Sequence, residues 1–170
     1  LVHARDCVEE IPADRWDWCS VSGDPAEGPY TNVRWGGFID DIDHFDASFF
    51  GISPSEAELM DPQHRLFMQA SWALLESAGI RPSSLQGKRV GVFAGVNLTD
   101  YCELIERNTD DIDPLLLNGT LHMFCAGRVS FMLRSTGPSQ AIDTACSSSL
   151  VAVHRAVLSL QQWESELALA

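Results

Sequence analysis

Cys146 lies where the sequence predicts that a short strand passes directly into a helix. Small residues on both sides permit a tight strand-to-helix elbow, like the one that exposes the serine nucleophile of hydrolases. At a helix N-terminus, the helix dipole and unpaired backbone N–H groups favour the reactive thiolate. The same N–H groups could stabilise an oxyanion on an attacked thioester carbonyl. The pattern predicts a nucleophile, and a small buried cysteine beside a polar cap is an equally weighted alternative.

The residues near Cys146 allow both a structural and a functional interpretation. We expect Asp143 to be a plain turn acceptor, although it could orient the elbow backbone. We expect Arg128 to pair with a buried acid such as Asp143 rather than to bind substrate. Hydrogen bonding at the site, or helix capping and close packing, would explain three serines equally well: Ser147, Ser148 and Ser149. Two cysteines on expected helical faces are interpreted as small apolar residues: Cys102 and Cys125.

None of the five histidines is an obvious general base for Cys146. His154 follows eight residues later on the same helix, about 12 Å along its axis, whereas a nucleophile–base hydrogen bond spans about 3 Å. We therefore expect a packing or interface role for it. His122 could approach the pocket, but a cap or surface role fits better, and His64 in a first helical turn is expected to be structural. Two histidines in expected loops suggest no function: His3 and His44.

The clearest predicted helix begins at Asp61 and Pro62. Aspartate is a good N-cap residue, and proline fits the first helical position. Gly79 is expected to end the helix. Apolar residues recur between them at helical spacing: Leu66, Phe67, Ala70, Leu74 and Ala78.

The elements after this helix alternate between strand and helix. Residues 89–94 have the pattern of a buried strand, and residues 99–107 that of a short helix. Thr120 is expected to cap a second long helix, which Gly137 and Pro138 stop. The last two expected elements are a short strand and a third helix, residues 139–144 and 147–163. This alternation indicates the α/β class.

The N-terminal part of the chain is predicted to be irregular. Residues 1–37 are rich in proline and glycine breakers, and the acidic stretch 38–50 carries apolar residues that we expect to pack on a core. Aromatic residues in the first stretch are expected to pin it to a body of protein that is partly missing: Trp16, Trp18, Tyr30 and Trp35. The acidic stretch 100–113 is most simply a solvated face.

Composition excludes several classes of protein. The chain has 170 residues, 45% of them hydrophobic and 21% charged, which is typical of a globular domain or part of one. The formal net charge of -13 argues against a general nucleic-acid binder. Residues 1–61 hold 14 acids and 3 bases, whereas residues 114–163 hold one acid and three arginines, so the latter could face an anionic ligand.

Targeting signals and disulfide patterns are not apparent. No apolar run approaches the roughly 20 residues of a membrane span, and no signal peptide is visible. The five cysteines are odd in number, widely spaced and form no C-x-x-C pair, which favours a reducing, cytoplasmic environment. Both ends look cut, so we expect a fragment.

Many ordered blocks of the sequence resemble one family. Residues 143–150 are similar to the active-site elbow of β-ketoacyl synthases, specifically the ketosynthase domains of modular type I polyketide synthases. Further blocks resemble this family in the same order: residues 8–16, 36–46, 49–54, 56–57, 60–65, 90–95, 127–131 and 137–139. Residues 125–127 and 133–136 depart from the usual pattern, which affects local packing or substrate preference rather than the family.

The resemblance implies a thiolase-like α/β fold made of two similar halves. Residues 1–170 would be a single region covering most of the N-terminal half, truncated at both ends. It would lack the family's first strand and the C-terminal half, which contributes two histidines. No metal or redox cofactor is implied, and none is bound directly, because substrates are carried on the phosphopantetheine of acyl carrier protein.

The resemblance also implies a reaction. Cys146 would accept an acyl chain as a thioester from acyl carrier protein. A malonyl-type extender would then lose carbon dioxide and attack that thioester in a Claisen condensation, in polyketide or fatty acid biosynthesis. The complete domain would be a homodimer that pairs strands at residues 139–144, with no nucleic-acid or membrane partner. Two alternatives remain: a ketosynthase that only transfers chains, and a catalytically dead piece that binds a partner.

Overall fold

The computed structural model describes residues 5–108 and 114–170, and the chain divides into two compact units, Leu1–Ile42 and Asp43–Ala170. The second unit alternates helices with strands, as the sequence predicts, and its three-stranded sheet is parallel, which confirms the α/β class. No helix within the described residues is long and apolar enough to cross a membrane.

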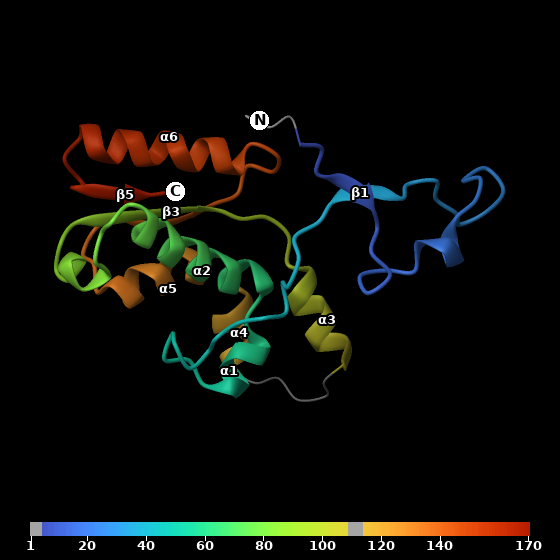
Figure 1. Ribbon diagram of the computed structural model, residues 1–170, viewed down its shortest axis with the longest axis horizontal. Helices are drawn as coiled ribbons and strands as arrows, with labels where there is room; N and C mark the ends of the chain where they lie inside the picture. The colour runs from blue at the N-terminus through green and yellow to red at the C-terminus, as the bar shows by residue number, and fades with distance from the viewer. Residues whose placement is uncertain (1–4, 109–113) are drawn as a thin grey trace. The chain divides into compact units, whose positions relative to one another are not determined.

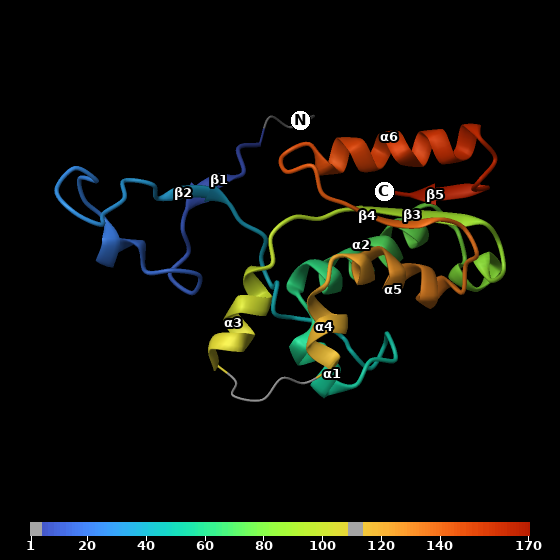
Figure 2. The same ribbon diagram turned by 180° about the vertical axis from the view of Figure 1, so that it is seen from behind.

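The first unit is built on an antiparallel ladder between β1 (Val8–Glu10) and β2 (Trp35–Gly37), both visible in Figure 2. The 3-10 helix η1 (Trp18–Val21) lies in the long connection between them. The sequence predicts only loops here. Strands of three residues are too short for alternation to reveal them, so the ladder is an addition to the expected picture.

Aromatic side chains of the first unit contact other residues of the same unit. The guanidinium of Arg34 lies 5.7 Å from the ring centroid of Trp18 and 5.4 Å from that of Trp35, within cation–π range. The Tyr30 ring lies against Gly23, where an added Cβ would come within 2.9 Å of it. These aromatics therefore organise their own loop, although Trp35 and Tyr30 remain about half exposed.

A three-stranded parallel sheet forms the centre of the second unit. Its order is β4 (Ser139–Ile142), β3 (Val90–Gly95) and β5 (Leu167–Leu169). The middle strand pairs Val92 with Ser139 on one side and with Leu169 on the other. The predicted strand after residue 89 is confirmed, and the apolar C-terminal run forms a third strand that the sequence did not indicate.

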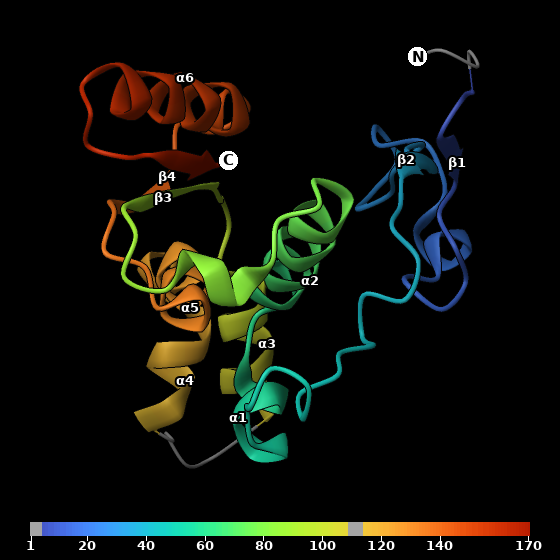
Figure 3. The ribbon, with the colours of Figure 1, turned by 60° about the vertical axis from the view of Figure 1, so that its left-hand side comes forward.

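Helices cover both faces of this sheet. Figures 1 and 3 show α2 (Pro62–Ser77) and α5 (Met123–Leu133) on one face and α6 (Ser148–Gln161) on the other. Alternate residues of β3 face the two helical layers, as the pleat requires. Val92 belongs to the cluster with α2 and α5, whereas Phe93 packs on Ala152 and Ala156 of α6. Burial on both faces explains the continuous apolar run of this strand.

The first long helix has the predicted ends. Asp61 caps α2, and its carboxylate accepts from the backbone N–H of Gln63 at 2.8 Å. Gly79 follows the helix with a φ of +67°, a conformation that glycine adopts without steric cost. The short helix α3 (Asp100–Asn108) also lies where the sequence places it.

The ends of α5 differ from the prediction. Thr120 does not cap it: this residue ends the helix α4 (Pro114–Thr120), and its hydroxyl donates back to the Leu116 carbonyl at 2.8 Å. α5 instead follows His122, which makes no side-chain capping bond. Arg134, with a φ of +49°, ends the helix before Gly137 and Pro138 are reached. Arginine in this conformation has no sequence signature, because glycine is the usual residue there.

The remaining short elements lie around this core. Ser53 caps the helix α1 (Pro54–Leu59) by accepting from the N–H of Glu56 at 3.2 Å. The 3-10 helix η2 (Pro82–Leu85) leads into β3. The predicted irregular segment before α1 packs on the core through Phe45 and Phe50, whose rings stack with centroids 5.1 Å apart.

Candidate active site

The predicted elbow joins β4 to α6. The strand ends at Ile142, the helix begins at Ser148, and Cys146 lies exposed between them. No side chain in residues 5–108 and 114–170 hydrogen-bonds to its sulfur. The cysteine is therefore accessible, unlike a small buried cysteine beside a helix cap.

The residue before Cys146 has an uncommon backbone conformation. Ala145 has a φ of +54°, in the left-handed region that costs a non-glycine residue about 1–2 kcal/mol. The surrounding hydrogen bonds must hold this conformation. It turns the chain sharply from strand to helix, and so presents the next residue at the surface.

Hydrogen bonds from the side chains of two serines close the elbow. The Ser148 hydroxyl accepts from the Thr144 N–H at 2.9 Å and donates to the Ala145 carbonyl at 2.7 Å. The Ser147 hydroxyl donates to the Thr144 carbonyl at 2.9 Å. Ser148 is buried, whereas Ser149 is exposed. The serines therefore close the turn, and none supplies a side-chain N-cap to α6.

Two backbone N–H groups just after Cys146, those of Ser147 and Ser148, are not free for an oxyanion. The Ser148 N–H donates to the Ala145 carbonyl at 3.0 Å, and the Ser147 N–H lies 3.4 Å from the Thr144 carbonyl. Both groups are used within the elbow. The expectation that unpaired N–H groups at the helix start are available to a substrate is therefore wrong for these two.

Asp143 is the turn acceptor that the sequence predicts. One of its oxygens, Oδ1, accepts from the Ala145 N–H at 3.0 Å and from the side-chain amide of Asn97 at 2.6 Å. The hydrogen bond from Ala145 has the largest effect in lowering the pKa of the Asp143 carboxyl, and the bond from Asn97 has the next largest. The carboxyl is thus held ionised, which strengthens both bonds. The sequence reasoning missed Asn97, whose only signal is its place just after a predicted strand.

A glycine lets the helix start come close to the central strand. A Cβ added to Gly95 would lie 2.8 Å from the Ser149 nitrogen and 2.9 Å from the Ser148 carbonyl carbon. Because those atoms are backbone, no side-chain rotation can relieve the contact. Gly95 therefore fixes how the elbow sits on the end of β3.

The histidines are placed away from a general-base role at Cys146. His154 is exposed on α6, and the Nε2 of His122 lies 2.9 Å from the Leu98 carbonyl oxygen. His64 is buried at 1% exposure in the first turn of α2, which fits the predicted structural role. The pKa of His64 is lowered to about 4, mainly by its burial and to a smaller extent by the nearby charge of Arg128.

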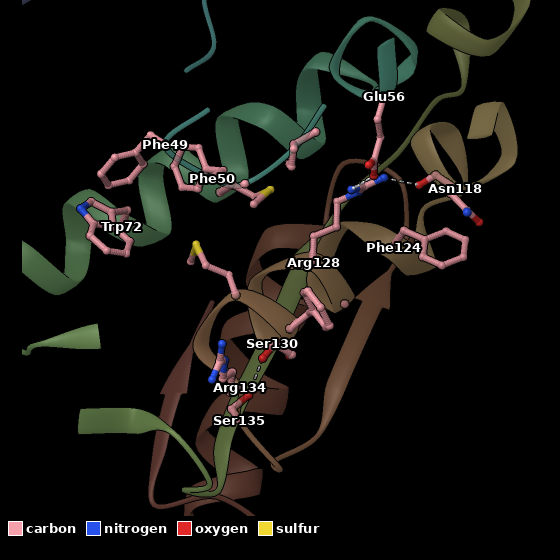
Figure 4. A pocket seen from close by; sticks show the side chains of 16 residues that line it. Phe49, Phe50, Glu56, Trp72, Asn118, Phe124, Arg128, Ser130, Arg134 and Ser135 are labelled. Atoms are coloured by element: carbon pink, nitrogen blue, oxygen red, sulfur yellow. Dashed lines mark hydrogen bonds and ion pairs between the residues drawn. The ribbon is translucent and has the colours of Figure 1, made fainter. Parts of the chain in front are cut away.

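Arg128 does not pair with Asp143, so that expectation is wrong. Its Nη1 lies 2.7 Å from an oxygen of Glu56, and its Nη2 donates to the Asn118 carbonyl at 3.1 Å. Figure 4 shows this pair in a groove lined by residues of α1, α2, α4 and α5, beside the ring of Phe124 and apart from the rings of Phe49, Phe50 and Trp72. Sequence spacing could not reveal a partner so far away along the chain.

Two other cysteines, Cys125 and Cys102, differ from Cys146 in their surroundings. Cys125 is fully buried, and this burial is the main reason why the pKa of its thiol is raised to about 12. Cys102 is partly exposed on α3, and its sulfur lies 3.7 Å from a Glu106 oxygen. In the described part of the chain, no group of three or more histidine, cysteine and acidic residues could hold a metal ion.

Comparison with known families gives this elbow its context. Residues 1–170 match the family model described as the beta-ketoacyl synthase, N-terminal domain. The chain therefore belongs to the beta-ketoacyl synthases, as its sequence blocks indicate.

Curated relatives narrow the class to polyketide synthases. The chain is 47% identical over 171 residues to one subunit of the phenolphthiocerol/phthiocerol polyketide synthase of Mycobacterium tuberculosis, a match that covers 100% of the chain and 9% of that protein. It is 47% identical over 171 residues to polyketide synthase PksN of Bacillus subtilis, with 100% and 3% covered. The chain thus spans a small part of the relatives it matches.

Solved ketosynthase structures share the fold. The ketosynthase from module 6 of the bacillaene synthase of Bacillus subtilis 168 matches with a TM-score of 0.80 and 40% identity, over 99% of this chain and 26% of that one. The oxazolomycin ketosynthase domain of Streptomyces albus JA3453 matches with a TM-score of 0.85 and 40% identity, over 98% and 29%. The chain has part of the thiolase-like ketosynthase fold.

Proposed function

We propose that Cys146 is the nucleophile of a condensing ketosynthase and accepts an acyl chain as a thioester. The exposed thiol on a strained strand-to-helix elbow, in a chain of this family, is the observation that carries the proposal. The donor would be a thioester on the phosphopantetheine arm of acyl carrier protein. That assignment follows from the family and from the accessible position of the sulfur.

The first proposed step is an acyl transfer between two sulfur atoms. The Cys146 thiolate attacks the donor thioester carbonyl, and a tetrahedral intermediate forms. Its collapse expels the phosphopantetheine thiolate, which leaves the acyl group on Cys146. Thioester is exchanged for thioester, so no oxidant or reductant is needed.

The second proposed step is a decarboxylative Claisen condensation in the complete domain. A malonyl-type extender on acyl carrier protein loses carbon dioxide, and the resulting carbanion attacks the carbonyl of the Cys146 thioester. A carbon–carbon bond forms as the carbon–sulfur bond breaks, and the thiolate is regenerated. Two histidines contributed by the other half of the family's fold would assist decarboxylation.

A chain-transfer ketosynthase is the second candidate function. It would use the same elbow for the first step and omit the second. The two candidates therefore differ in whether malonyl-carrier protein is consumed, and not in the role of Cys146. A catalytically dead piece that only binds a partner would show neither step.

The decisive experiment is acylation of the complete domain by an N-acetylcysteamine thioester. We expect the Cys146→Ala variant to lose acylation, while the Cys102→Ala variant keeps it, because Cys102 lies on α3 away from the elbow. Equal loss in both variants would remove the assignment of Cys146. Addition of malonyl-carrier protein then separates condensation from chain transfer.

A further inference from the structure

The chain just after β3 is strained and firmly held beside the elbow. Leu98 has a φ of +68°, a conformation that leucine rarely adopts. Its carbonyl accepts from the Nε2 of His122 at 2.9 Å and from the amide of Gln63 at 3.3 Å. Because a carbonyl oxygen only accepts, Nε2 is the protonated nitrogen of this histidine. The amide of Gln63 also contacts Asp61, the N-cap of α2, at 3.3 Å.

These anchors fix the residue that precedes Leu98. The side-chain amide of Asn97 donates to Oδ1 of Asp143 at 2.6 Å, and the same oxygen accepts from the Ala145 N–H at 3.0 Å. Two donors that converge on one ionised oxygen form a charge-assisted bridge. The bridge links the loop after β3 to the left-handed residue immediately before Cys146.

Other contacts between the loop and the elbow do not replace this bridge. The Val96 N–H donates to the Ile142 carbonyl at 3.1 Å, which ends the ladder before the elbow begins. Among the hydrogen bonds of the described residues, Asn97 supplies the one side chain from outside residues 143–148 that reaches this turn. The serine bonds within the turn close it locally but do not tie it to β3.

We propose that Asn97 is a positioning residue for Cys146, acting through Asp143 and Ala145, an inference that rests on the proposed nucleophile. Asn97 holds the Asp143 carboxylate where it fixes the left-handed turn. The turn in turn sets the direction from which the sulfur approaches a bound thioester. A loss of alignment lowers the rate of attack and leaves substrate binding largely intact.

The test is the acylation kinetics of the complete domain with an N-acetylcysteamine thioester. For Asn97→Ala we expect about a tenfold fall in the acylation rate constant, with KM changed less than about twofold. In an Asp143→Ala background the bridge is already lost. Because Asn97 acts through that carboxylate, adding Asn97→Ala to Asp143→Ala should lower the acylation rate by less than about a further twofold. Asn97→Asp alone sets two carboxylates against each other and should be slower than Asn97→Ala.

A matched control removes an asparagine bond elsewhere. The amide of Asn108 donates to the Leu104 carbonyl within α3 at 2.6 Å, so Asn108→Ala loses a similar bond away from the elbow. We expect its acylation rate to equal that of the unaltered domain. The melting temperature of each variant separates a folding defect from a change in alignment.

Three results would overturn the inference. One is an Asn97→Ala variant that acylates at the unaltered rate. Another is an Asn97→Ala change that lowers the rate as much in the Asp143→Ala background as in the unaltered domain, at equal melting temperature. An unaltered domain whose Cys146 reacts with iodoacetamide but takes up no acyl group would instead refute the proposed function, and the positioning role would fall with it.

Discussion

The two cysteines with the most contrasting surroundings, Cys146 and Cys125, show how environment decides reactivity. Cys146 is exposed at a turn, whereas Cys125 of α5 is buried in the hydrophobic core. Only the thiolate reacts, so a thiol with a pKa of about 12 is almost entirely inert near neutral pH. The number of cysteines in the sequence thus says little about the number of reactive ones.

We predict that iodoacetamide at pH 8 labels Cys146 in the native domain and leaves Cys125 unlabelled. The reason is the burial of Cys125 and its raised pKa of about 12. Mass spectrometry of peptides checks this, with guanidinium-unfolded protein as the control in which Cys125 does react. Native labelling of both cysteines at similar rates would contradict the assigned burial.

His64 gives a prediction about acid stability. Its pKa is about 4 in the folded chain and about 6.5 when unfolded, so the unfolded state binds the proton first as pH falls. The free energy of unfolding should therefore fall from about pH 6.5 down to about pH 4, by an amount on the order of 3 kcal/mol. The groups around it include Arg128 and His122, whose charges act in the same direction.

Denaturant unfolding of the complete domain at pH 7 and at pH 4.5 measures this loss. His64→Gln should flatten the pH dependence, although it lowers stability at pH 7 because it disturbs a filled core site. His154→Gln, at an exposed position of α6, should leave the slope unchanged. A slope that is the same with and without His64 would show that other groups cause the acid loss.

At the scale of elements, the approach of α6 to β3 decides where the elbow lies. We predict that Gly95→Ala destabilises the domain by about 1–3 kcal/mol and slows acylation, because the new Cβ meets the backbone of Ser148 and Ser149. Gly37→Ala is the control, since the nearest atom there is the Cys7 carbonyl oxygen at 3.9 Å. Thermal melting and acylation rates report the two effects. A Gly95→Ala variant as stable and as fast as the control would argue against this packing.

Elements with local sequence signals were predictable, and those fixed by distant contacts were not. The cap at Asp61 and the stop at Gly79 are local, and the structure confirms both. Arg134 ends α5 in a left-handed conformation through backbone bonds to Ser130 and Phe131, which no residue type signals. Thr120 has the right type for a cap but lies at the end of another helix.

In the candidate site, too, the features set by neighbouring residues were predictable and the distant partners were not. The position of the elbow, its small residues and the turn acceptor Asp143 follow from neighbouring residues, so the sequence predicts them. The partner of Asp143 is Asn97 rather than Arg128, which pairs with Glu56. Both partners lie tens of residues away along the chain, and only the parallel pairing of β3 with β4 brings the first of them to the elbow.

At the scale of the whole molecule, the free edge of β4 suggests a partner. β4 is an edge strand in the described sheet. The N–H groups of Val92 and Val96 donate to Pro138 and Ile142, so the amides of Ser139 and Ala141 point away from β3. An edge with unpaired donors and acceptors is normally covered or paired. A twofold mate would extend the sheet through this edge.

We predict that the complete ketosynthase domain is a dimer that uses this edge. Light scattering should give twice the mass of one chain, and hydrogen exchange should show protected amides at Ser139 and Ala141. In a monomer those two amides exchange quickly, because the described sheet offers them no acceptor. A stable monomer in light scattering would rule the dimer out.

The last prediction concerns the 170-residue chain by itself, which should form no carbon–carbon bonds. Leu150 of α6 and Trp163 just after this helix are each 76% exposed, and Phe131 of α5 is 87% exposed. Apolar surface of this extent favours association, so light scattering should show aggregation.

No histidine of the described residues hydrogen-bonds to Cys146, and loss of general acid–base groups typically costs about 10²- to 10⁴-fold in rate. With malonyl-carrier protein the purified chain should yield no condensation product, while slow alkylation of Cys146 persists. Condensation at a rate near that of a complete ketosynthase domain would show that this chain carries its own catalytic base, and would refute the assignment of that role to residues outside it.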